Sequence, residues 1–256
     1  MVTDAKMRAE NYVNSVQWHK RLEREIPFLK DLFTKHSYQK LLDLGCGPGF
    51  HPQKLADLGF EVVGLDLSEP MINYALEHHT KASFRRGNFL DDPSLLEGEF
   101  DMIYSLGNAL MIIWSHLGDN QTIQDMFDIL GNAIRPGGGL FFQVLNSDNP
   151  RSGYVVSKIT KTEDSPTPNS ILVKHFLPLE GKLHTHFITL RWPDGGTEVV
   201  EEPNDQGHLM LLPLTKLQTI LAKAGFGDHT FYENYSGDPL DPETSDSLLC
   251  FARKNP

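Results

Sequence analysis

The chain contains 256 residues, carries a formal net charge of −11, and is 39% hydrophobic. This is the composition of a globular protein and excludes intrinsic disorder as the main state, because enough apolar side chains are present to offset chain entropy. No apolar run approaches the roughly 20 residues of a membrane-spanning helix, and the acidic balance argues against a broad contact with nucleic-acid phosphates.

The first predicted element is an amphipathic helix. Apolar residues recur at steps of three or four from Trp18 to Phe33, which predicts a stripe that packs on a core. Pro27 is expected to split this stretch, since proline is tolerated in a first helical turn but not inside a helix. Residues 1–37 are therefore either helices packed on the core or a lid that brings Tyr12 or Trp18 over a ligand.

Strands and helices then alternate along the chain. We predict strands at residues 41–44, 61–66, 82–85, 100–105 and 140–145, and helices at 52–58, 68–75 and 121–134. The glycine-rich turn that begins at Arg135 is expected to end the last of these helices. Such alternation predicts a parallel sheet in an α/β fold.

The pattern changes after residue 146. Residues 147–169 are rich in Ser, Pro, Asp and Asn and predict a loop, whereas residues 170–202 predict an antiparallel meander. We expect residues 147–212 to form an inserted cap above the carboxyl ends of the sheet, where ligands bind in such folds. A surface for homodimer formation is the alternative.

The α/β pattern returns after the insert, with a predicted helix at 214–224 and strands at 226–232 and 247–252. The fold is therefore predicted to be a Rossmann-like, mostly parallel seven-stranded sheet with helices on both faces. We expect a single domain, 1–256, whose core is made by residues 38–146 and 213–256.

The strongest chemical signal is the loop Asp43-Leu44-Gly45-Cys46-Gly47-Pro48-Gly49, directly after the first strand. Glycines let the backbone turn tightly and approach a ligand closely. Asp66 ends the second strand, 21 residues after Gly45, where a carboxylate can accept both hydroxyls of a ribose. A dinucleotide fold requires a glycine where Phe50 stands, and Asp43 suits a cationic amino-acid group better than a diphosphate.

These residues resemble the class I S-adenosylmethionine-dependent methyltransferases. Residues 41–49 match that family's first motif, residues 63–68 with Met71 match its second, and the turn at 135–138 precedes the fifth strand as in the family. The resemblance covers residues 38–146 and 213–254, and it implies S-adenosylmethionine as the cofactor. The residues it assigns to the cofactor are Asp43, Gly45, Cys46, Gly47, His51, Asp66, Leu67, Met71, Asn88, Phe89, Ser105 and Leu106. Capping of a helix is the alternative role of His51.

A narrower resemblance concerns the methyl acceptor. Leu106-Gly107-Asn108-Ala109 is similar to the loop after the fourth strand in glycine and sarcosine N-methyltransferases, which implies that Gly107, Asn108 and Asn146 contact a small acceptor. Those enzymes hold the acceptor carboxylate with an arginine where this chain has Gly131 or Asn132, which argues against glycine itself. Further candidates for lining the acceptor pocket are Tyr12, Trp18 and Tyr235.

Methyl transfer from a sulfonium is an in-line displacement, so the protein has to align the acceptor and exclude water. A general base is needed only if the acceptor arrives protonated. Asn108 and His116 are the expected catalytic residues, and further histidines in the meander are candidate bases: His175, His184, His186 and His208. His184 and His186 share a strand face, but no cysteine or carboxylate joins them, so we expect no metal.

The leading hypothesis is thus methyl transfer to a small molecule. A nicotinamide-dependent oxidoreductase, disfavoured by Phe50, and a non-catalytic protein that binds adenosylmethionine are the alternatives. No Asn-Pro-Pro-aromatic run follows the fourth strand to hold a flipped base, so we expect no nucleic-acid partner, and we expect no membrane partner. Cys46 and Cys250 make no disulfide framework and no export signal is evident, which favours a cytoplasmic location.

Overall fold

The chain divides into two compact units. The computed structural model describes residues 9–10, 12–14, 16–97, 100–118, 121–149, 154–160, 170–179, 182–191, 198–202 and 208–256; from 154 to 208 it describes backbone, and of the side chains only that of His184. The core unit comprises residues 1–149 and 212–256, and the inserted unit comprises residues 150–211. No helix of the described residues is long and apolar enough to cross a membrane.

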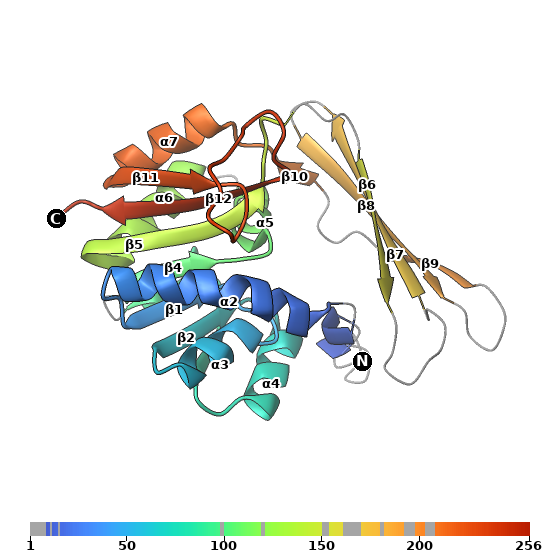
Figure 1. The fold of residues 1–256 in the computed structure, drawn as a ribbon, viewed down its shortest axis with the longest axis horizontal. Coiled ribbons are helices and arrows are strands. Elements are labelled where there is room, and N and C mark those ends of the chain that lie inside the picture. The colour runs from blue at the N-terminus through green and yellow to red at the C-terminus, as the bar shows by residue number, and fades with distance from the viewer. Residues whose placement is uncertain are drawn as a thin grey trace. The chain divides into compact units, whose positions relative to one another are not determined.

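The core unit is built on a seven-stranded sheet with the order β11-β12-β5-β4-β1-β2-β3 (Figure 1). Strands β1 to β5 pair in parallel, whereas β12 lies antiparallel between β5 and β11. The strands are β1 Lys40–Leu44, β2 Glu61–Asp66, β3 Ser83–Arg86, β4 Phe100–Ser105, β5 Ile134–Leu145, β11 Phe226–Tyr232 and β12 Ser247–Lys254. The strand order reverses between β1 and β4, and ligands bind at such a point in open α/β sheets. The predicted fold class is confirmed.

Helices cover both faces of this sheet (Figure 1). They are α2 Trp18–Lys35, α3 Phe50–Asp57, α4 Glu69–His78, α5 Ala109–Ser115, α6 Ile123–Ala133 and α7 Leu214–Lys223, with a 3₁₀ turn at Pro93–Leu96. Helix α6 begins at a capping box in which Thr122 and Asp125 exchange hydrogen bonds. Helix α5 was not predicted, because seven residues without a polar stripe give no helical periodicity.

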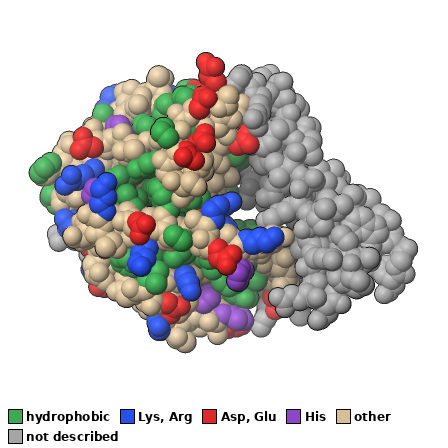
Figure 2. Space-filling model, viewed as in Figure 1, with side chains coloured by type: hydrophobic (Ala, Val, Ile, Leu, Met, Phe, Trp, Pro, Cys, Tyr) green, Lys and Arg blue, Asp and Glu red, His purple; other side chains and the backbone are tan. Residues whose placement is uncertain are grey.

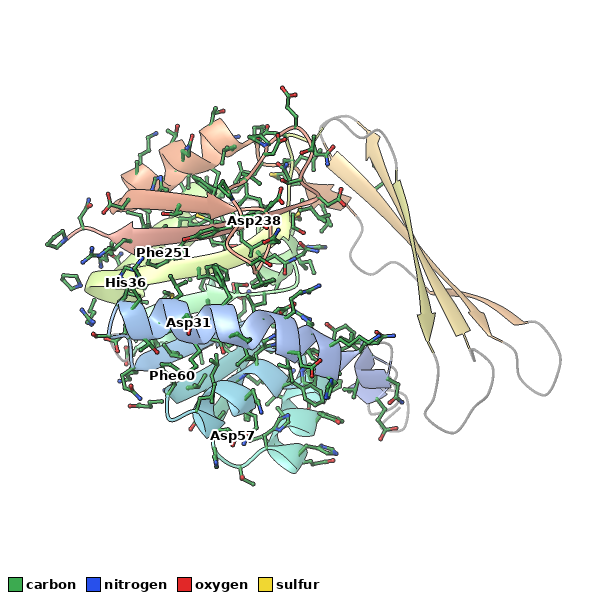
Figure 3. The ribbon with its side chains drawn as sticks, in the orientation of Figure 1. Asp31, His36, Asp57, Phe60, Asp238 and Phe251 are labelled. Carbon is green, nitrogen blue, oxygen red and sulfur yellow. The ribbon has the colours of Figure 1, made fainter. Side chains whose placement is uncertain are left out.

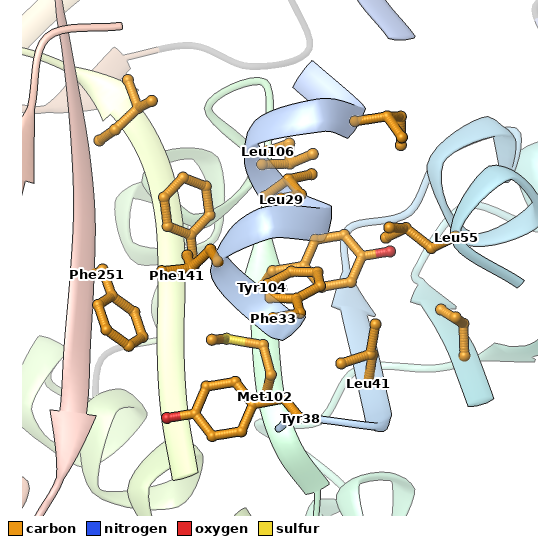
Figure 4. Packing of buried hydrophobic residues seen from close by; sticks show 14 of the residues in the cluster. Leu29, Phe33, Tyr38, Leu41, Leu55, Met102, Tyr104, Leu106, Phe141 and Phe251 are labelled. Atoms are coloured by element: carbon orange, nitrogen blue, oxygen red, sulfur yellow. The ribbon is translucent and has the colours of Figure 1, made fainter. Parts of the chain in front are cut away.

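Helix α2 runs unbroken from Trp18 to Lys35, so the predicted split at Pro27 is wrong. Proline has no N–H, so Pro27 leaves the Glu23 carbonyl without its usual helical partner. Both residues are exposed, and water can therefore hydrogen-bond to that carbonyl. On the opposite side of the helix, Leu29 and Phe33 are fully buried and pack over β1, β4 and β5 (Figure 4). From Ile26 onward, α2 is part of the core, and its first turns extend beyond the carboxyl ends of β1 and β4 (Figure 1).

The other end of the sheet is closed by side-chain packing. His36, which follows α2, lies against Phe251 of β12 with ring centroids 4.9 Å apart (Figure 3). The Asp101 carboxylate accepts the N–H groups of Gln39 and Lys40 at 2.7 Å and pairs with Arg135. These contacts fix the amino-terminal ends of the strands and leave the carboxyl ends for a site.

Strand β5 begins at Ile134, earlier than predicted, and includes the turn expected at Arg135. Its pairing with β4 shifts register between Phe100 and Met102. At Gly138 a Cβ would lie 2.7 Å from the Asp101 carbonyl, so only glycine lets the two strands come this close.

The inserted unit is a five-stranded antiparallel sheet with the path β10-β8-β7-β6 and β9 paired to β8. Its strands are β6 Tyr154–Thr160, β7 Ser170–Leu179, β8 Lys182–Arg191, β9 Glu198–Glu202 and β10 His208–Met210. The predicted loop at 147–169 is wrong where β6 forms. This strand is stabilised by pairing with β7, which the composition of residues 147–169 alone does not indicate. The residues that connect β7 to β8 and β8 to β9, 180–181 and 192–197, lie outside the described residues.

Cross-strand register places four histidines on one face of this sheet. His186 lies opposite His175, and His184 lies opposite His208. Residues directly opposite one another in an antiparallel pair share a face, as do residues two apart in one strand. The candidate bases of the meander thus occupy three neighbouring strands of the inserted unit.

Candidate functional site

The glycine loop after β1 turns through left-handed backbone at Gly45, Gly47 and Gly49, with φ of 77°, 53° and 83°. A Cβ at Gly45 would lie 2.5 Å from that of Ala109, and one at Gly49 would lie 2.7 Å from the Phe84 ring, so packing demands glycine at both positions. A Cβ at Gly47 would meet nothing within 4 Å. Gly47 therefore exposes its backbone to open space, as a backbone that a ligand approaches closely must.

The carboxylate of Asp66, at the end of β2, is fixed by this loop. One oxygen accepts the Gly47 N–H at 2.7 Å and the other accepts the Ser68 N–H at 2.8 Å. Burial raises the pKa of Asp66, and these N–H donors oppose the rise. Each carboxylate oxygen can accept another hydrogen bond. Leu67, the next residue, is 66% exposed, so a carboxylate that can accept further hydrogen bonds lies beside an open apolar side chain.

Asp43, before the loop, is only 2% exposed. Burial, with smaller contributions from the Asp66 and Glu25 charges, raises the pKa of Asp43 to about 8, although Tyr104 and Arg21 lower it. Cys46 is also packed beside it, and its pKa is raised well above the usual value by burial. A cationic group bound beside Asp43 would favour its ionised form. The position therefore fits the cationic group predicted from the sequence.

Replacing Asp43 by asparagine is expected to stabilise the ligand-free chain increasingly as pH rises. A carboxyl whose pKa is raised on folding binds its proton more tightly when folded, so its unfavourable effect grows from about pH 4 to about pH 8 and is constant above that range. Thermal unfolding of wild type and Asp43→Asn between pH 5 and pH 9 measures this difference. Asp57→Asn, an exposed carboxyl with a lowered pKa, is the control. A midpoint difference that does not vary with pH would contradict the assignment.

Helix α2 contributes a buried ionic cluster. Glu25 is 1% exposed and accepts hydrogen bonds from Arg21 Nε at 3.1 Å, Arg24 Nη2 at 2.7 Å and His51 Nε2 at 2.9 Å. Burial alone would raise the pKa of Glu25, but the hydrogen bond from His51 and the charge of Arg21 hold it at about 2. Burial lowers the pKa of His51, so a neutral imidazole donates Nε2–H to a charged carboxylate. His51, predicted to contact the cofactor, has this internal partner.

The Arg21 guanidinium covers the loop after β4. A Cβ at Gly107 would lie 3.0 Å from Arg21 Nη2, and the Arg21 Cζ lies 5.2 Å from the centre of the Trp18 ring. Trp18 stacks on Phe50 with centroids 4.5 Å apart, and its indole N–H is buried with no partner among the described residues. The first turns of α2 therefore bring a cation, and an N–H donor that has no partner in the described part of the chain, to the ends of β1 and β4.

Arg21 and Glu25 were not predicted as site residues. A signal was present, because the pair is spaced by four residues on the same side of the helix as Trp18, Leu22 and Leu29. A charged pair on an otherwise apolar stripe indicates a buried ionic contact, and here that contact faces the glycine loop.

Other predicted cofactor residues lie at the ends of neighbouring strands. Ser105 is fully buried and its hydroxyl donates to the Leu44 carbonyl at 2.8 Å, which ties β4 to β1, and Leu106 follows it. After β3, the Asn88 side chain donates to Asp91 and accepts the Leu90 N–H, while Phe89 is 2% exposed. The side-chain nitrogen and oxygen of Asn88 thus each make one hydrogen bond within its own turn.

The predicted acceptor residues are only partly brought together. Gly107 and Asn108 form consecutive left-handed residues, with φ of 64° and 68°, and the Asn108 side-chain oxygen is buried without a partner among the described residues. The Asn146 side chain donates to the Pro242 and Ser245 carbonyls at 2.8 and 2.9 Å and accepts from Asp148. Asn146 therefore already has internal partners for its amide.

Tyr12, Tyr235 and His116 have different surroundings. Tyr12 is 41% exposed and meets the Trp18 ring edge-on at 6.1 Å. Tyr235 is buried, and its hydroxyl donates to the Gln143 side chain at 3.3 Å. His116 is exposed at the far end of α5, about 12 Å of helix rise from Asn108, and its Nδ1 donates to the Ile112 carbonyl at 2.8 Å. The structure does not bring His116 together with the other site residues.

Comparison with known proteins identifies the domain. Residues 41–138 match a family model described as a methyltransferase domain. The chain carries a methyltransferase domain. The ubiquinone biosynthesis O-methyltransferase of Hydrogenovibrio crunogenus is 30% identical to it over 132 residues, 50% of this chain and 51% of that protein. Human glycine N-methyltransferase is 28% identical over 135 residues, 48% of this chain and 46% of that protein. The chain spans about half the length of these curated relatives.

Solved structures share the fold of this methyltransferase domain. S-adenosylmethionine-bound CalS10, an amino pentose methyltransferase from Micromonospora echinaspora, has a TM-score of 0.70 at 19% identity, over 99% of this chain and 97% of that one. A methyltransferase from Clostridium acetobutylicum has a TM-score of 0.69 at 13% identity, over 90% of both chains. At these identities the likeness confirms the fold, and the family model over residues 41–138 confirms the resemblance to methyltransferases that the sequence indicated.

Proposed function

We propose that the chain transfers the methyl group of S-adenosylmethionine to a small-molecule acceptor. The observation that carries this proposal is the open backbone at Gly47 beside the Asp66 carboxylate, where the strand order reverses. S-adenosylmethionine would supply a methyl group already activated on a sulfonium. The task of the protein is then to hold both reactants in line and exclude water.

Each part of the cofactor has a chemically matching partner in the core unit. Asp66 accepts the ribose hydroxyls, and the exposed Leu67 covers one face of the adenine. Asp43 lies where it can balance the ammonium group, and Arg21 lies where it can balance the carboxylate. Met71, Asn88 and Phe89 complete the adenine side in this proposal.

In this proposal the methyl acceptor binds beside Gly107 and Asn108. The side-chain oxygen of Asn108 is buried and has no partner in the described part of the chain, so it can orient an N–H or O–H group of the acceptor. A base is required only for an acceptor that arrives protonated. His116 lies at the far end of α5 from this loop. The histidine bases expected from the sequence stay predictions.

The kind of acceptor is limited to a small molecule in this proposal. The relatives' names include both O- and N-methyltransferases, so the atom that is methylated is left open. On the face shown in Figure 2, acidic and basic side chains of the described residues are interspersed, which disfavours a nucleic-acid surface there. Homodimer formation through the inserted sheet and a cytoplasmic location remain predictions.

Calorimetric titration of the purified chain with S-adenosylhomocysteine and, separately, with NADH tests the proposal. We expect saturable binding of S-adenosylhomocysteine and none of NADH. The reverse result would favour the nicotinamide-dependent alternative. Transfer of tritium from methyl-labelled S-adenosylmethionine into a metabolite extract then distinguishes an enzyme from a protein that only binds the cofactor.

Asn108→Gly is expected to lower the rate of that tritium transfer on the order of tenfold to a hundredfold, because the group that orients the acceptor is lost. Glycine is chosen since Asn108 has a φ of 68°, which alanine would adopt only with strain. Affinity for S-adenosylhomocysteine should change little. An equal loss of both properties would place Asn108 among the cofactor contacts instead.

A further inference from the structure

Gln143 of β5 accepts hydrogen bonds from both Gly107 and Asn108, the left-handed residues of the loop after β4. We call this the acceptor loop, because the methyl acceptor is proposed to bind beside it. Its side-chain oxygen accepts the Gly107 N–H at 3.1 Å, and its main-chain carbonyl accepts the Asn108 N–H at 3.2 Å. Left-handed backbone is unfavourable for most residues other than glycine, although asparagine adopts it more readily, so these two hydrogen bonds help to hold Gly107 and Asn108 in this conformation.

Gln143 is itself held from two other elements. The hydroxyl of Tyr235 donates to the same side-chain oxygen at 3.3 Å, and the side-chain nitrogen of Gln143 donates to Ser247 Oγ of β12 at 3.5 Å. Tyr235 is buried and packs against Phe28 of α2 at 5.8 Å, and Arg24 lies over its ring at 5.6 Å. The amide therefore has a fixed orientation, with its oxygen toward the loop.

We propose that Gln143 is a positioning residue that holds the Gly107–Asn108 loop in the conformation from which Asn108 meets the methyl acceptor. The inference rests on the proposed function and extends it to a residue outside the family motifs. It also gives Tyr235 a different role from pocket lining: its hydroxyl orients Gln143. The main-chain contact to Asn108 survives any substitution at 143, so the side chain acts on the loop through Gly107.

Residue-specific amide hydrogen exchange, measured by NMR on the full chain, tests this directly. Gln143→Met keeps the length of the side chain and removes its acceptor, so exchange at Gly107 should accelerate about tenfold, the effect of losing one hydrogen bond. Gln143→Glu restores an acceptor oxygen and should return exchange at Gly107 to near the wild-type rate. Gln124→Met, on α6, is the matched control and should leave Gly107 unchanged.

Two results would overturn the inference. One is unchanged exchange at Gly107 in Gln143→Met. The other is acceleration throughout the β4–β5 pairing, as at Phe142, which would mean that Gln143 only stabilises the sheet. Titration with S-adenosylhomocysteine separates the two proposals, because a wild-type chain that fails to bind it refutes the proposed function whatever the exchange rates show.

Discussion

Asp66→Ala is expected to weaken binding of S-adenosylmethionine on the order of a hundredfold. Hydrogen bonds to a charged acceptor contribute about 1.5–3 kcal/mol, and each 1.4 kcal/mol is about tenfold in affinity. The substitution removes both ribose contacts of the proposal and also frees the Gly47 and Ser68 N–H groups, which the carboxylate holds at 2.7 and 2.8 Å. Calorimetry with S-adenosylhomocysteine measures the loss.

Asp66→Asn separates the two effects of that substitution. Asparagine keeps one acceptor oxygen for the loop but replaces the other with a donor, so affinity should fall by an intermediate amount. Asp57→Ala, at an exposed carboxyl paired with Lys81, is the matched control and should bind as wild type does. Undiminished affinity in Asp66→Ala would remove the ribose assignment.

Glu25→Ala is expected to destabilise the core unit by about 3–5 kcal/mol, the effect of breaking a buried ion pair on one side. Arg21 would lose its partner while remaining mostly buried, and His51 Nε2 would lose its acceptor. At about 2–4 °C per kcal/mol for a chain of this size, the unfolding midpoint should fall on the order of 10 °C. Thermal unfolding at pH 7 measures the effect.

The same cluster predicts a response to acid. The pKa of Glu25 is depressed to about 2 in the folded chain, so its stabilising contribution is fully present above its ordinary value near 4.5 and is lost as pH falls toward 2. The gap between wild type and Glu25→Ala should therefore narrow below about pH 4.5. Glu23→Ala, on the same helix but exposed, is the control for charge removal. A gap that is constant from pH 7 to pH 3 would show that Glu25 acts through packing alone.

Local patterns predicted the core strands well because each signal lies within a few residues. Strands β2 and β4 have the predicted bounds, since an apolar run that ends in Asp66 or before Gly107 needs no distant partner to be recognised. The glycine loop was predicted equally well, because positive φ and the close approach of Ala109 and Phe84 restrict Gly45 and Gly49 to glycine. The turn at Arg135 failed as a boundary, since pairing with β4 extends β5 through it.

The amino acid sequence by itself determined the α/β fold and the methyltransferase motifs, and with them the proposed cofactor, because these depend on periodicity and on residue types at short spacings. Tertiary structure decided which residues from distant parts of the chain lie beside these motifs. Only folding brings Arg21 over Gly107, which lies 86 positions away in the sequence. Only the β4–β5 pairing brings Gln143 to where it accepts hydrogen bonds from the N–H groups of Gly107 and Asn108. It also gave His51 and Asn146 internal partners, since buried polar atoms take the nearest satisfactory hydrogen bond whatever motif they belong to.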